Sequence, residues 1–460
     1  MKKQKQKRSP SFDMDTVALG VLTLLTVLFG VVVFLGTQAG IRVTATLPGQ
    51  SLIGPFQKIK LTFSEPVNPD LAASLFSIQP AVNGNLEWLD ERTLQFVPIE
   101  PFQPDTNYKL TLRSGALTAK GRALKNDRSW EFNVREPLIV YLNTNDNQSS
   151  LWIMDLNNTP AQQITPADIK IISFDASADG EFIIFTSTNT QGGIDLWRVS
   201  RAGNDAYILL DCGRDRCTTP AIAPNGTRIA YAREAAGPGP DLPFGSPRIW
   251  ILDLQSKQNS PIYEDQQILG YGPTWSPDSN KIASFDGLAD QIRLLDLATG
   301  KQLIFPSNTG GPITWSAGST KFLFTDIQQN ENGLITRVRL ADLTLNDTST
   351  VLGENDNRDY SYYSLAWSPA DDSFLLGLRT SEEKPAQVFA VIDLNILDGI
   401  IIADQEDYTY NSPRWDPWGT ALIFQQFKLH GAFKPEIGLW KSGFSEPLIL
   451  TQGIMPHWLP

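Results

Sequence analysis

Two cysteines and two histidines are the residues of this chain best suited to chemistry, and their spacing limits what they can do. Cys212 and Cys217 lie in the segment DCGRDRC, and the sequence has no third cysteine. In an oxidising compartment two such thiols form a disulfide across a small loop. A zinc site is the alternative interpretation, but it needs more ligands, and His430 and His457 lie far away in the sequence. We predict the disulfide, and no bound metal or cofactor.

Signatures of catalysis are sparse. A Ser-His-Asp hydrolase needs a histidine base beside a nucleophile, yet the sequence has no G-x-S-x-G turn, and it also lacks a Walker motif and G-x-G-x-x-G. His430 lies in the segment KLHGAF, and His457 lies close to the C-terminus. We therefore predict that the protein is not an enzyme. A carboxylate-pair enzyme acting on a carbohydrate stays open as the alternative, because acidic residues are abundant.

Two acid-rich segments could hold calcium. They are NTNDNQ at residues 143–148 and ENDNRDY at residues 354–360. Runs of this kind are more often solvated turns, because Asp and Asn favour turn conformations. We expect turns here, with calcium as the alternative.

The charge distribution argues against nucleic acid as a partner. The net charge is −12, but five positive charges lie within the first eight residues, which leaves −17 for the rest of the chain. A globular part this acidic repels phosphate backbones.

An uncharged segment begins at Thr16 and ends at Thr37, directly after the basic residues 1–15. A helix of about 20 apolar residues can cross the hydrocarbon layer of a membrane, and the basic flank is expected to stay in the cytoplasm. A cleaved signal peptide is the alternative, with residues 37–39 (TQA) as an acceptable cleavage site. We predict a single-pass membrane protein whose globular domains lie outside the cytoplasm, which is also the compartment that suits the disulfide.

From about residue 41 to residue 135 the sequence consists of short alternating runs between turns, as in IKLTF, TLQFV, YKLTL and WEFNV. About seven such runs in a segment of this length predict a β-sandwich. The ordered series LTFSEPV, FSIQPAVNGNLEW, LQFVPIEPFQPDTNYKLTL and SWEFNV resembles the bacterial Ig-like domain of surface-layer proteins, the SbsA type. That resemblance implies a spacer or adhesion module without catalysis.

A repeat with a period of roughly 40 to 53 residues occupies residues 137–460, which is the period of β-propeller blades. Its mark is a strand that ends in an aromatic or apolar residue and a tight turn, as in TWSPDSN, TWSAGST, AWSPADD and RWDPWGT. We expect the tryptophans before these turns, Trp275, Trp315, Trp367 and Trp415, to pack between neighbouring blades. The repeat resembles the TolB-type or WD40-like propeller family, which implies the fold strongly and a function only weakly.

The number of blades follows from the two ends of the repeat region. Six complete repeats are present, and residues 138–165 supply three further strands without the tryptophan-containing one. The missing strand is found at the C-terminus, where MPHWLP is similar to GPTWSP. We predict an all-β fold in which a transmembrane helix and an Ig-like sandwich precede a seven-bladed propeller closed by the C-terminal strand. Six blades, the usual number in TolB-type propellers, is the alternative.

Two long loops, residues 233–248 and residues 427–436, are expected on one face of this propeller, each between the second and third strands of a blade. Aromatic and cationic side chains on rigidly supported loops are typical of interface anchors. The candidate binding residues are Phe244 and Arg248 in the first loop and His430, Phe433 and Lys434 in the second.

The sequence thus favours a non-catalytic, membrane-anchored binding or scaffold protein whose partner is a protein or a cell-envelope polymer. Two alternatives are the carbohydrate enzyme mentioned above and a surface sensor. The sensor is weakened by residues 1–15, which are too few for a cytoplasmic signalling domain.

Overall fold

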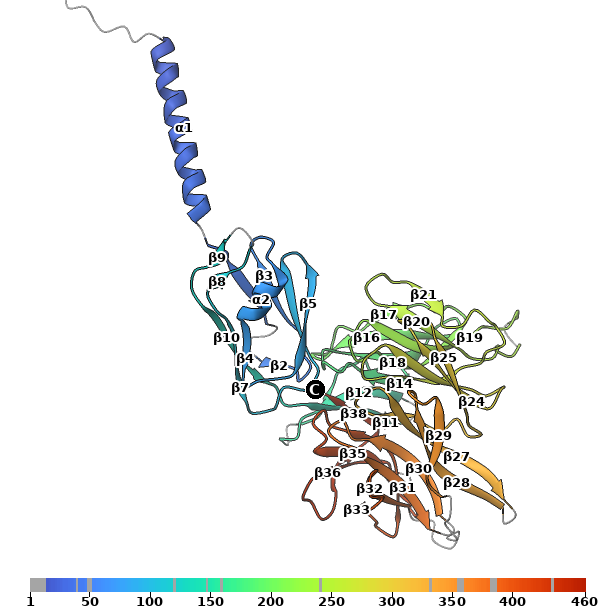
Figure 1. The fold of residues 1–460 in the computed structure, drawn as a ribbon. Coiled ribbons are helices and arrows are strands. Elements are labelled where there is room, and N and C mark those ends of the chain that lie inside the picture. The colour runs from blue at the N-terminus through green and yellow to red at the C-terminus, as the bar shows by residue number, and fades with distance from the viewer. Residues whose placement is uncertain are drawn as a thin grey trace, which may run out of the picture. The chain divides into compact units, whose positions relative to one another are not determined.

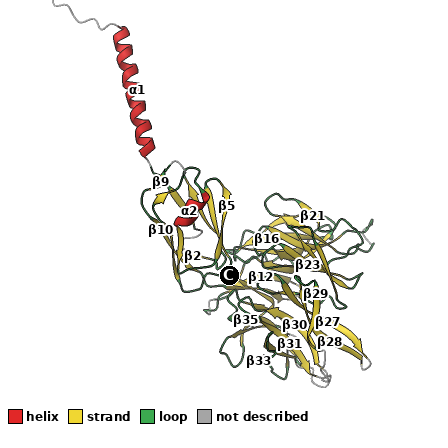
Figure 2. Cartoon of the chain, viewed as in Figure 1, coloured by secondary structure: helices red, strands yellow, loops and turns green. Residues whose placement is uncertain are grey.

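The computed structural model describes residues 14–460 except 39, 48–51, 119–120, 146–147, 158–159, 240–241, 331–332, 354–359, 381–386 and 432–433. The chain divides into two compact units (Figures 1 and 2). The first contains residues 1–52, 58–100 and 107–133. The second contains residues 53–57, 101–106 and 134–460.

The uncharged N-terminal segment forms helix α1, Met14–Gln38. The large apolar side chains described on this helix are exposed, among them Leu19, Leu22 and Phe29. No helix in the described part of the chain proves long and apolar enough to cross a membrane. The structure therefore does not support the span predicted from Thr16 to Thr37.

The Ig-like part is a sandwich of two four-stranded sheets. One has the order β1 (Val43–Thr46), β3 (Ile59–Phe63), β6 (Thr93–Pro98), β5 (Gly84–Asp90), and the other the order β2 (Leu52–Ile53), β10 (Arg128–Val134), β7 (Asn107–Leu112), β4 (Phe76–Gln79). A two-stranded sheet joins β8 (Gly115–Ala116) and β9 (Ala123–Leu124). Burial alternates along the strands as the sequence predicts: Ile59, Leu61 and Phe63 of β3 are buried, while Lys60 and Thr62 are exposed.

One short helix interrupts this β-structure. Helix α2, Pro69–Leu75, begins after Asn68, whose side-chain oxygen accepts a hydrogen bond from the backbone N–H of Leu71 (3.1 Å). Asparagine is a favoured N-cap, and proline suits the first position of a helix. The sequence analysis did not predict this helix.

The rest of the chain folds into antiparallel sheets that are consistent with propeller blades. In the described residues the strands form seven four-stranded units. A parallel pairing of Ile194 with Arg216 joins the second and third units into one sheet. In chain order the strands are β11 (Leu138–Asn145), β12 (Gln148–Met154), β13 (Gln162–Gln163); β14 (Ile171–Ala176), β15 (Phe182–Thr188), β16 (Ile194–Ser200), β17 (Tyr207–Leu210); β18 (Arg216–Ile222), β19 (Arg228–Glu234), β20 (Arg248–Asp253), β21 (Asn259–Pro261); β22 (Tyr271–Trp275), β23 (Lys281–Asp286), β24 (Gln291–Asp296), β25 (Gln302–Pro306); β26 (Thr314–Trp315), β27 (Lys321–Asn330), β28 (Gly333–Asp342), β29 (Asp347–Leu352); β30 (Tyr360–Trp367), β31 (Ser373–Thr380), β32 (Gln387–Asp393), β33 (Gly399–Ala403); and β34 (Tyr408–Trp415), β35 (Ala421–Lys428), β36 (Glu436–Lys441), β37 (Leu448–Gln452).

The C-terminal strand β38 (Ile454–Leu459) completes the first unit, whose order is β13-β12-β11-β38. Its register places Trp458 opposite Ile139 and His457 opposite Val140. The strand therefore occupies the position that the sequence analysis expects for MPHWLP.

A hydrophobic core fills the space between each unit and the next. The first and second units share a core that contains Val140 and Phe185, and the seventh and first share one that contains Ile423 and Trp458. The five intervening pairs of units are packed in the same way. In the described residues the last unit thus packs on the first through a core of the same kind.

Tryptophan indoles link these units by hydrogen bonds as well. Trp275 donates to the carbonyl oxygen of Ala221 (2.9 Å), and Trp415 donates to that of Ala366 (3.0 Å). In each pair the donor lies on the first strand of one unit and the acceptor on the first strand of the preceding unit. These tryptophans therefore hold neighbouring units together in two ways, through apolar packing and through a backbone hydrogen bond.

Candidate functional site

The first of the two predicted binding loops connects β19 to β20 and is fastened at its base. The guanidinium of Arg233 binds the carboxylate of Asp215 through Nε (2.8 Å) and Nη2 (2.7 Å). The other oxygen of Asp215 accepts a hydrogen bond from the backbone N–H of Ala236 (2.8 Å), and the N–H of Gly245 donates to the carbonyl of Ala235 (2.8 Å). Both nitrogens of Arg233 contact the same oxygen of Asp215, and charge-assisted hydrogen bonds of this kind are stronger than those between neutral groups. The loop is therefore held in a defined conformation where it leaves the sheet.

Two candidate residues of this loop, Phe244 and Arg248, make structural contacts. The guanidinium of Arg216 lies over the ring of Phe244 at 3.7 Å from its centre, and Phe244 is half-buried. Arg248 donates to the backbone carbonyls of Tyr263 (2.6 Å) and Asp265 (3.1 Å). Leu242 is a large apolar residue of this loop that is 50% exposed. The sequence analysis did not name it as a candidate.

The segment that supports this loop is closed by a disulfide between Cys212 and Cys217, whose Cα atoms lie 6.4 Å apart. Both cysteines are buried in the core between the second and third units. The residues between them include Asp215 and Arg216, which hold Arg233 and Phe244. The predicted disulfide and the predicted binding loop are thus parts of one substructure, a relation that the sequence did not reveal.

The second predicted loop connects β35 to β36 and is more exposed. The side chain of His430 is 82% exposed, and its Nδ1 lies 3.9 Å from an oxygen of Asp407. Lys434 is also exposed, and Phe433 lies outside the described residues. Among the residues that the structure describes, no contact joins His430 or Lys434 to Phe244 or Arg248. The structure thus presents the candidates on two separate loops.

A third group of residues that could take part in chemistry lies on β38, β14 and β34. The sequence analysis missed this group. His457 on β38 places Nδ1 3.4 Å from an oxygen of Asp175 on β14 and Nε2 3.4 Å from Nη2 of Arg414 on β34. The carboxylate of Asp175 also accepts hydrogen bonds from the backbone N–H of Ile222 (2.7 Å) and of Ala176 (3.0 Å). One signal was available in the sequence: each of these residues directly precedes the aromatic or apolar residue of its repeat motif.

The electrostatics of this group favour a neutral imidazole. Burial lowers the pKa of His457 below its ordinary value, the guanidinium of Arg414 lowers it further, and the carboxylate of Asp175 acts in the opposite direction. A neutral His457 that donates from Nδ1 to Asp175 is left with Nε2 as an acceptor for Arg414. The three side chains then form a chain of hydrogen bonds from a cation to an anion.

Backbone bulges aim the residues of these first strands. The pairing of β34 with β35 shifts register between Asn411 and Arg414, and Ser412 has φ 51°. Met455 lies two residues before His457 and has φ 53°. Left-handed backbone is uncommon for residues other than glycine, and bulges re-aim the side chains beside them. The same device therefore orients both Arg414 and His457.

Three other buried carboxylates of the propeller-like part already have hydrogen-bond or ion-pair partners. Asp286 pairs with Arg293 at 2.7 Å, and Asp326 pairs with Arg339 at 3.4 Å. Burial raises the pKa of Asp416, but its carboxylate accepts hydrogen bonds from the N–H and the hydroxyl of Thr420 in its own turn (both 2.8 Å). None of these three groups faces a second free carboxylate among the described residues.

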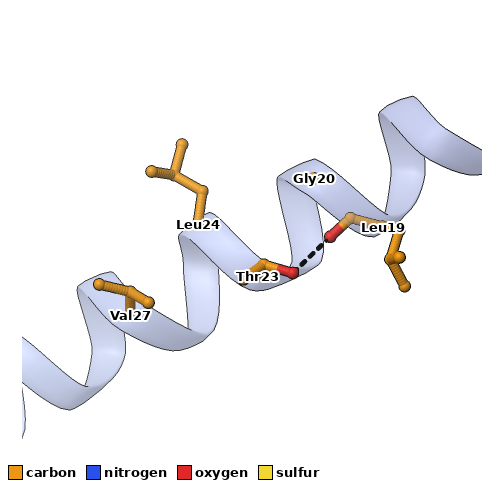
Figure 3. Close-up of a pocket in the computed structure, with 5 residues that line it drawn as sticks. All are labelled: Leu19, Gly20, Thr23, Leu24 and Val27. Carbon is orange, nitrogen blue, oxygen red and sulfur yellow. Dashed lines mark hydrogen bonds between the residues drawn. The ribbon is translucent and has the colours of Figure 1, made fainter.

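Two surface hollows offer little to a ligand. One lies on helix α1 and is lined by a single helix, with the hydroxyl of Thr23 donating to the carbonyl of Leu19 (2.7 Å; Figure 3). The other lies between turns of the fifth and sixth units, where Asp371 accepts hydrogen bonds from Ser373 in its own turn. Neither hollow brings together groups that are free to act on a substrate.

The described residues contain no cluster of side chains suited to a metal ion. The two acid-rich segments named as calcium candidates are only partly covered, because residues 146–147 and 354–359 lie outside the described residues.

Comparisons with known proteins agree with this architecture. The model of the bacterial Ig-like domain family matches residues 38–134. Among solved structures, TolB from Acinetobacter baumannii is similar with a TM-score of 0.42 and 15% identity, over 70% of this chain and 82% of that protein. A prolyl endopeptidase structure gives 0.50 and 10%, over 69% of this chain and 50% of that one, and an oligogalacturonate lyase from Vibrio parahaemolyticus gives 0.49 and 11%, over 69% and 87%.

These likenesses concern the fold alone, and they include both TolB proteins and enzymes. No curated protein matches the chain. The predicted combination of a bacterial Ig-like domain with a TolB-like propeller fold is confirmed, and function has to be argued from the residues.

Proposed function

We propose that this protein is a non-catalytic binding or scaffold protein, and that its seven four-stranded units are the blades of one closed propeller. The Ig-like domain serves as a spacer, and the propeller presents loops to a protein or a cell-envelope polymer. A ring of blades is a rigid support, and function in such folds usually resides in the loops that the support carries.

The observation that carries this proposal is the fastened loop between β19 and β20. A disulfide-closed segment holds it through the Asp215–Arg233 pair and through Arg216 over Phe244. A loop fastened at its base loses less conformational freedom when it binds, so the exposed surface of Leu242 and the part of Phe244 that Arg216 does not cover are available for affinity. Contacts this specific are unnecessary for a loop that only connects two strands.

A carbohydrate enzyme is less well supported. Glycoside hydrolysis needs two carboxyl groups that face one substrate bond. The buried carboxylates of Asp286 and Asp326 are paired with arginines, and Asp416 is bound within its own turn. A surface sensor has no observation in its favour beyond the N-terminal helix. Nucleic acid is disfavoured by the net charge of −17 that remains after the basic N-terminus.

We also propose the location that the sequence predicts, with residues 1–15 in the cytoplasm and the globular domains outside. Three features support it: the uncharged segment from Thr16 to Thr37, the five positive charges before it, and the pairing of the only two cysteines. This segment is then the contact of the protein with the membrane.

Capture from the native cell envelope tests the binding proposal. The full-length chain is immobilised, incubated with solubilised envelope, and the retained partner is identified and then used in purified form. We expect the double change Leu242→Ala and Phe244→Ala to weaken binding of this partner at least tenfold, since anchors at the centre of an interface each contribute about 2 kcal/mol or more. Phe433→Ala in the second loop is expected to weaken it further if both loops lie in one interface.

The matched control is Ile304→Ala on β25, which removes an apolar side chain that is 48% exposed, against 50% for Leu242. This control should leave both affinity and melting temperature nearly unchanged. Loss of binding with alanines in the turns at residues 277–280, together with normal binding of the Leu242 and Phe244 variant, would place the interface on the opposite face.

A further inference from the structure

We propose that Arg414, His457 and Asp175 form a binding site for a single carboxylate group of a small organic anion, at the inner edge of three adjacent blades. The site is separate from the two loops of the proposed function, and it assigns to the propeller a small-molecule ligand in addition to a macromolecular partner.

The strand register shows that the three residues occupy the same position in three successive units. Arg414 pairs with Ile423, His457 with Val140, and Asp175 with Ile184. In each case the partner is the third residue of the neighbouring strand, β35, β11 or β15. The residues therefore lie at one level of the ring, on the seventh, first and second units.

The other four units carry small residues at this level. The equivalent positions, again opposite the third residue of the neighbouring strand, are Ala221, Thr274, Thr314 and Ala366. The first strands of propeller blades surround a central channel. One arc of the ring thus carries a cation, an imidazole and a carboxylate, and the other arc carries only methyl and hydroxyl groups.

Arg414 has no counter-ion among the described residues. Its guanidinium is exposed, and its hydrogen-bond partner is the imidazole of His457 at 3.4 Å. In the described residues no carboxylate lies within ion-pair distance of it, whereas Arg233 and Arg293 each have a carboxylate oxygen at 2.7 Å. Because a guanidinium has five N–H donors in a planar fork, several remain for a ligand after the contact with His457.

His457 and Asp175 position this cation. The side chain of His457 is only 12% exposed, and its ring packs against Phe174 with 4.9 Å between ring centres. Asp175 is fixed by the backbone N–H groups of Ala176 and Ile222, so it holds the Nδ1 side of the imidazole in place. The imidazole then presents a fixed acceptor to Arg414, and the guanidinium is oriented before a ligand arrives.

The chemistry of the site favours a carboxylate over phosphate or sulfate. A planar carboxylate matches the guanidinium fork with two parallel hydrogen bonds. A doubly charged anion meets repulsion from Asp175, on the far side of His457, and from the surrounding acidic protein. A singly charged carboxylate meets about half of that repulsion and keeps both hydrogen bonds.

The two histidines of the chain make the test direct. The full-length protein is prepared without a histidine tag and with 13C-labelled histidine, so that only His430 and His457 give signals. A bound anion offsets the effect of Arg414, which with burial lowers the pKa of His457 while Asp175 raises it. Saturating acetate is therefore expected to raise the titration midpoint of His457, whereas the signals of His430, 82% exposed and on a separate loop, should not respond to acetate at constant pH. It follows that acetate binds more tightly as the pH falls.

Equilibrium dialysis with labelled acetate gives the second readout. We expect Arg414→Gln to weaken acetate binding roughly tenfold or more, as for the loss of a charged hydrogen-bond donor. Arg414→Lys keeps the charge without the fork, so it should also weaken binding while the His457 midpoint stays low in the free protein. It serves as the decisive variant if Arg414→Gln fails to fold. Arg228→Gln, a half-buried arginine on β19 whose Nε lies 3.8 Å from a carboxylate oxygen of Asp253, is the control and should bind like the unchanged protein.

Three results would overturn the proposal: no saturable acetate binding to the unchanged protein, unaltered binding in both Arg414 variants, or tighter binding of inorganic phosphate than of acetate. The last result would assign a general anion site in place of a carboxylate site.

Discussion

Removing the disulfide should do more than lower stability, because the bridged segment supports the loop between β19 and β20. For Cys212→Ala with Cys217→Ala, the sequence separation of 5 gives a loop-entropy contribution of about 2 kcal/mol to the free energy of unfolding. Both cysteines are 6% exposed or less, so alanine fills their places without adding a buried polar group. At roughly 2–4 °C per kcal/mol, the melting temperature should fall by about 4–8 °C.

The structural coupling is measured by hydrogen exchange at two amides. The N–H of Ala236 is bound by Asp215, and the N–H of Gly245 is bound by the carbonyl of Ala235. If the bridge holds this substructure, both amides should exchange up to about 30-fold faster in the double-alanine variant, the factor that corresponds to 2 kcal/mol. Amides in β35, in a distant unit, should show only the effect of the lower global stability.

The control is Asp215→Asn, which weakens the pair with Arg233 and leaves the bridge intact. It should speed exchange at Ala236 with a smaller loss of global stability, about 1 kcal/mol for a pair whose side chains are 26% and 24% exposed. Unchanged exchange at Ala236 and Gly245 in the double-alanine variant, despite a lower melting temperature, would refute the coupling. Two free thiols in the native protein would refute the disulfide itself.

Two further predictions concern closure and topology. Deleting residues 455–460 removes Trp458 from the core between the seventh and first units and Leu459 from the core between the first and second, at about 1.5–3 kcal/mol for each side chain, and it opens the edge of β11. Aggregation or a large fall in melting temperature is expected, and a truncated chain that melts like the full one would contradict closure by β38. Protease added to intact cells or spheroplasts should digest the propeller, whereas full protection until lysis would place it in the cytoplasm.

The sequence predicts those features of the fold that depend on local patterns. The alternation in IKLTF becomes the alternating burial of β3, and the similarity of MPHWLP to GPTWSP places β38 beside β11. Helix α2 had a recognisable signal, the N-cap Asn68 followed by Pro69, but its 7 residues make only about two turns and lie among strands. Such short helices owe more to their caps than to periodicity.

The site was less predictable because its contacts join residues that are distant in sequence. Phe244 is the type of residue that often anchors an interface, yet Arg216 covers its ring. Arg248 donates a hydrogen bond to the backbone carbonyl of Tyr263. His457 and Asp175 are separated by nearly the whole propeller in sequence and become neighbours only when β38 closes the ring. The motif similarity predicts that β38 closes the ring, but it does not show which side chains meet across that junction.

The junction itself raises the question of whether Arg414 and its neighbours serve only to close the ring. Packing imposes the same demands on all seven equivalent positions, and four of them are met by alanine or threonine. The histidine and the aspartate at two of the remaining three are largely buried, which costs desolvation that small residues avoid. A purely structural lock would be expected to pair the cation with the anion directly, as Arg293 and Asp286 do at 2.7 Å. Here the neutral imidazole of His457 separates them and leaves the guanidinium without a counter-ion among the described residues, which is the arrangement expected of a site that receives its anion from solution.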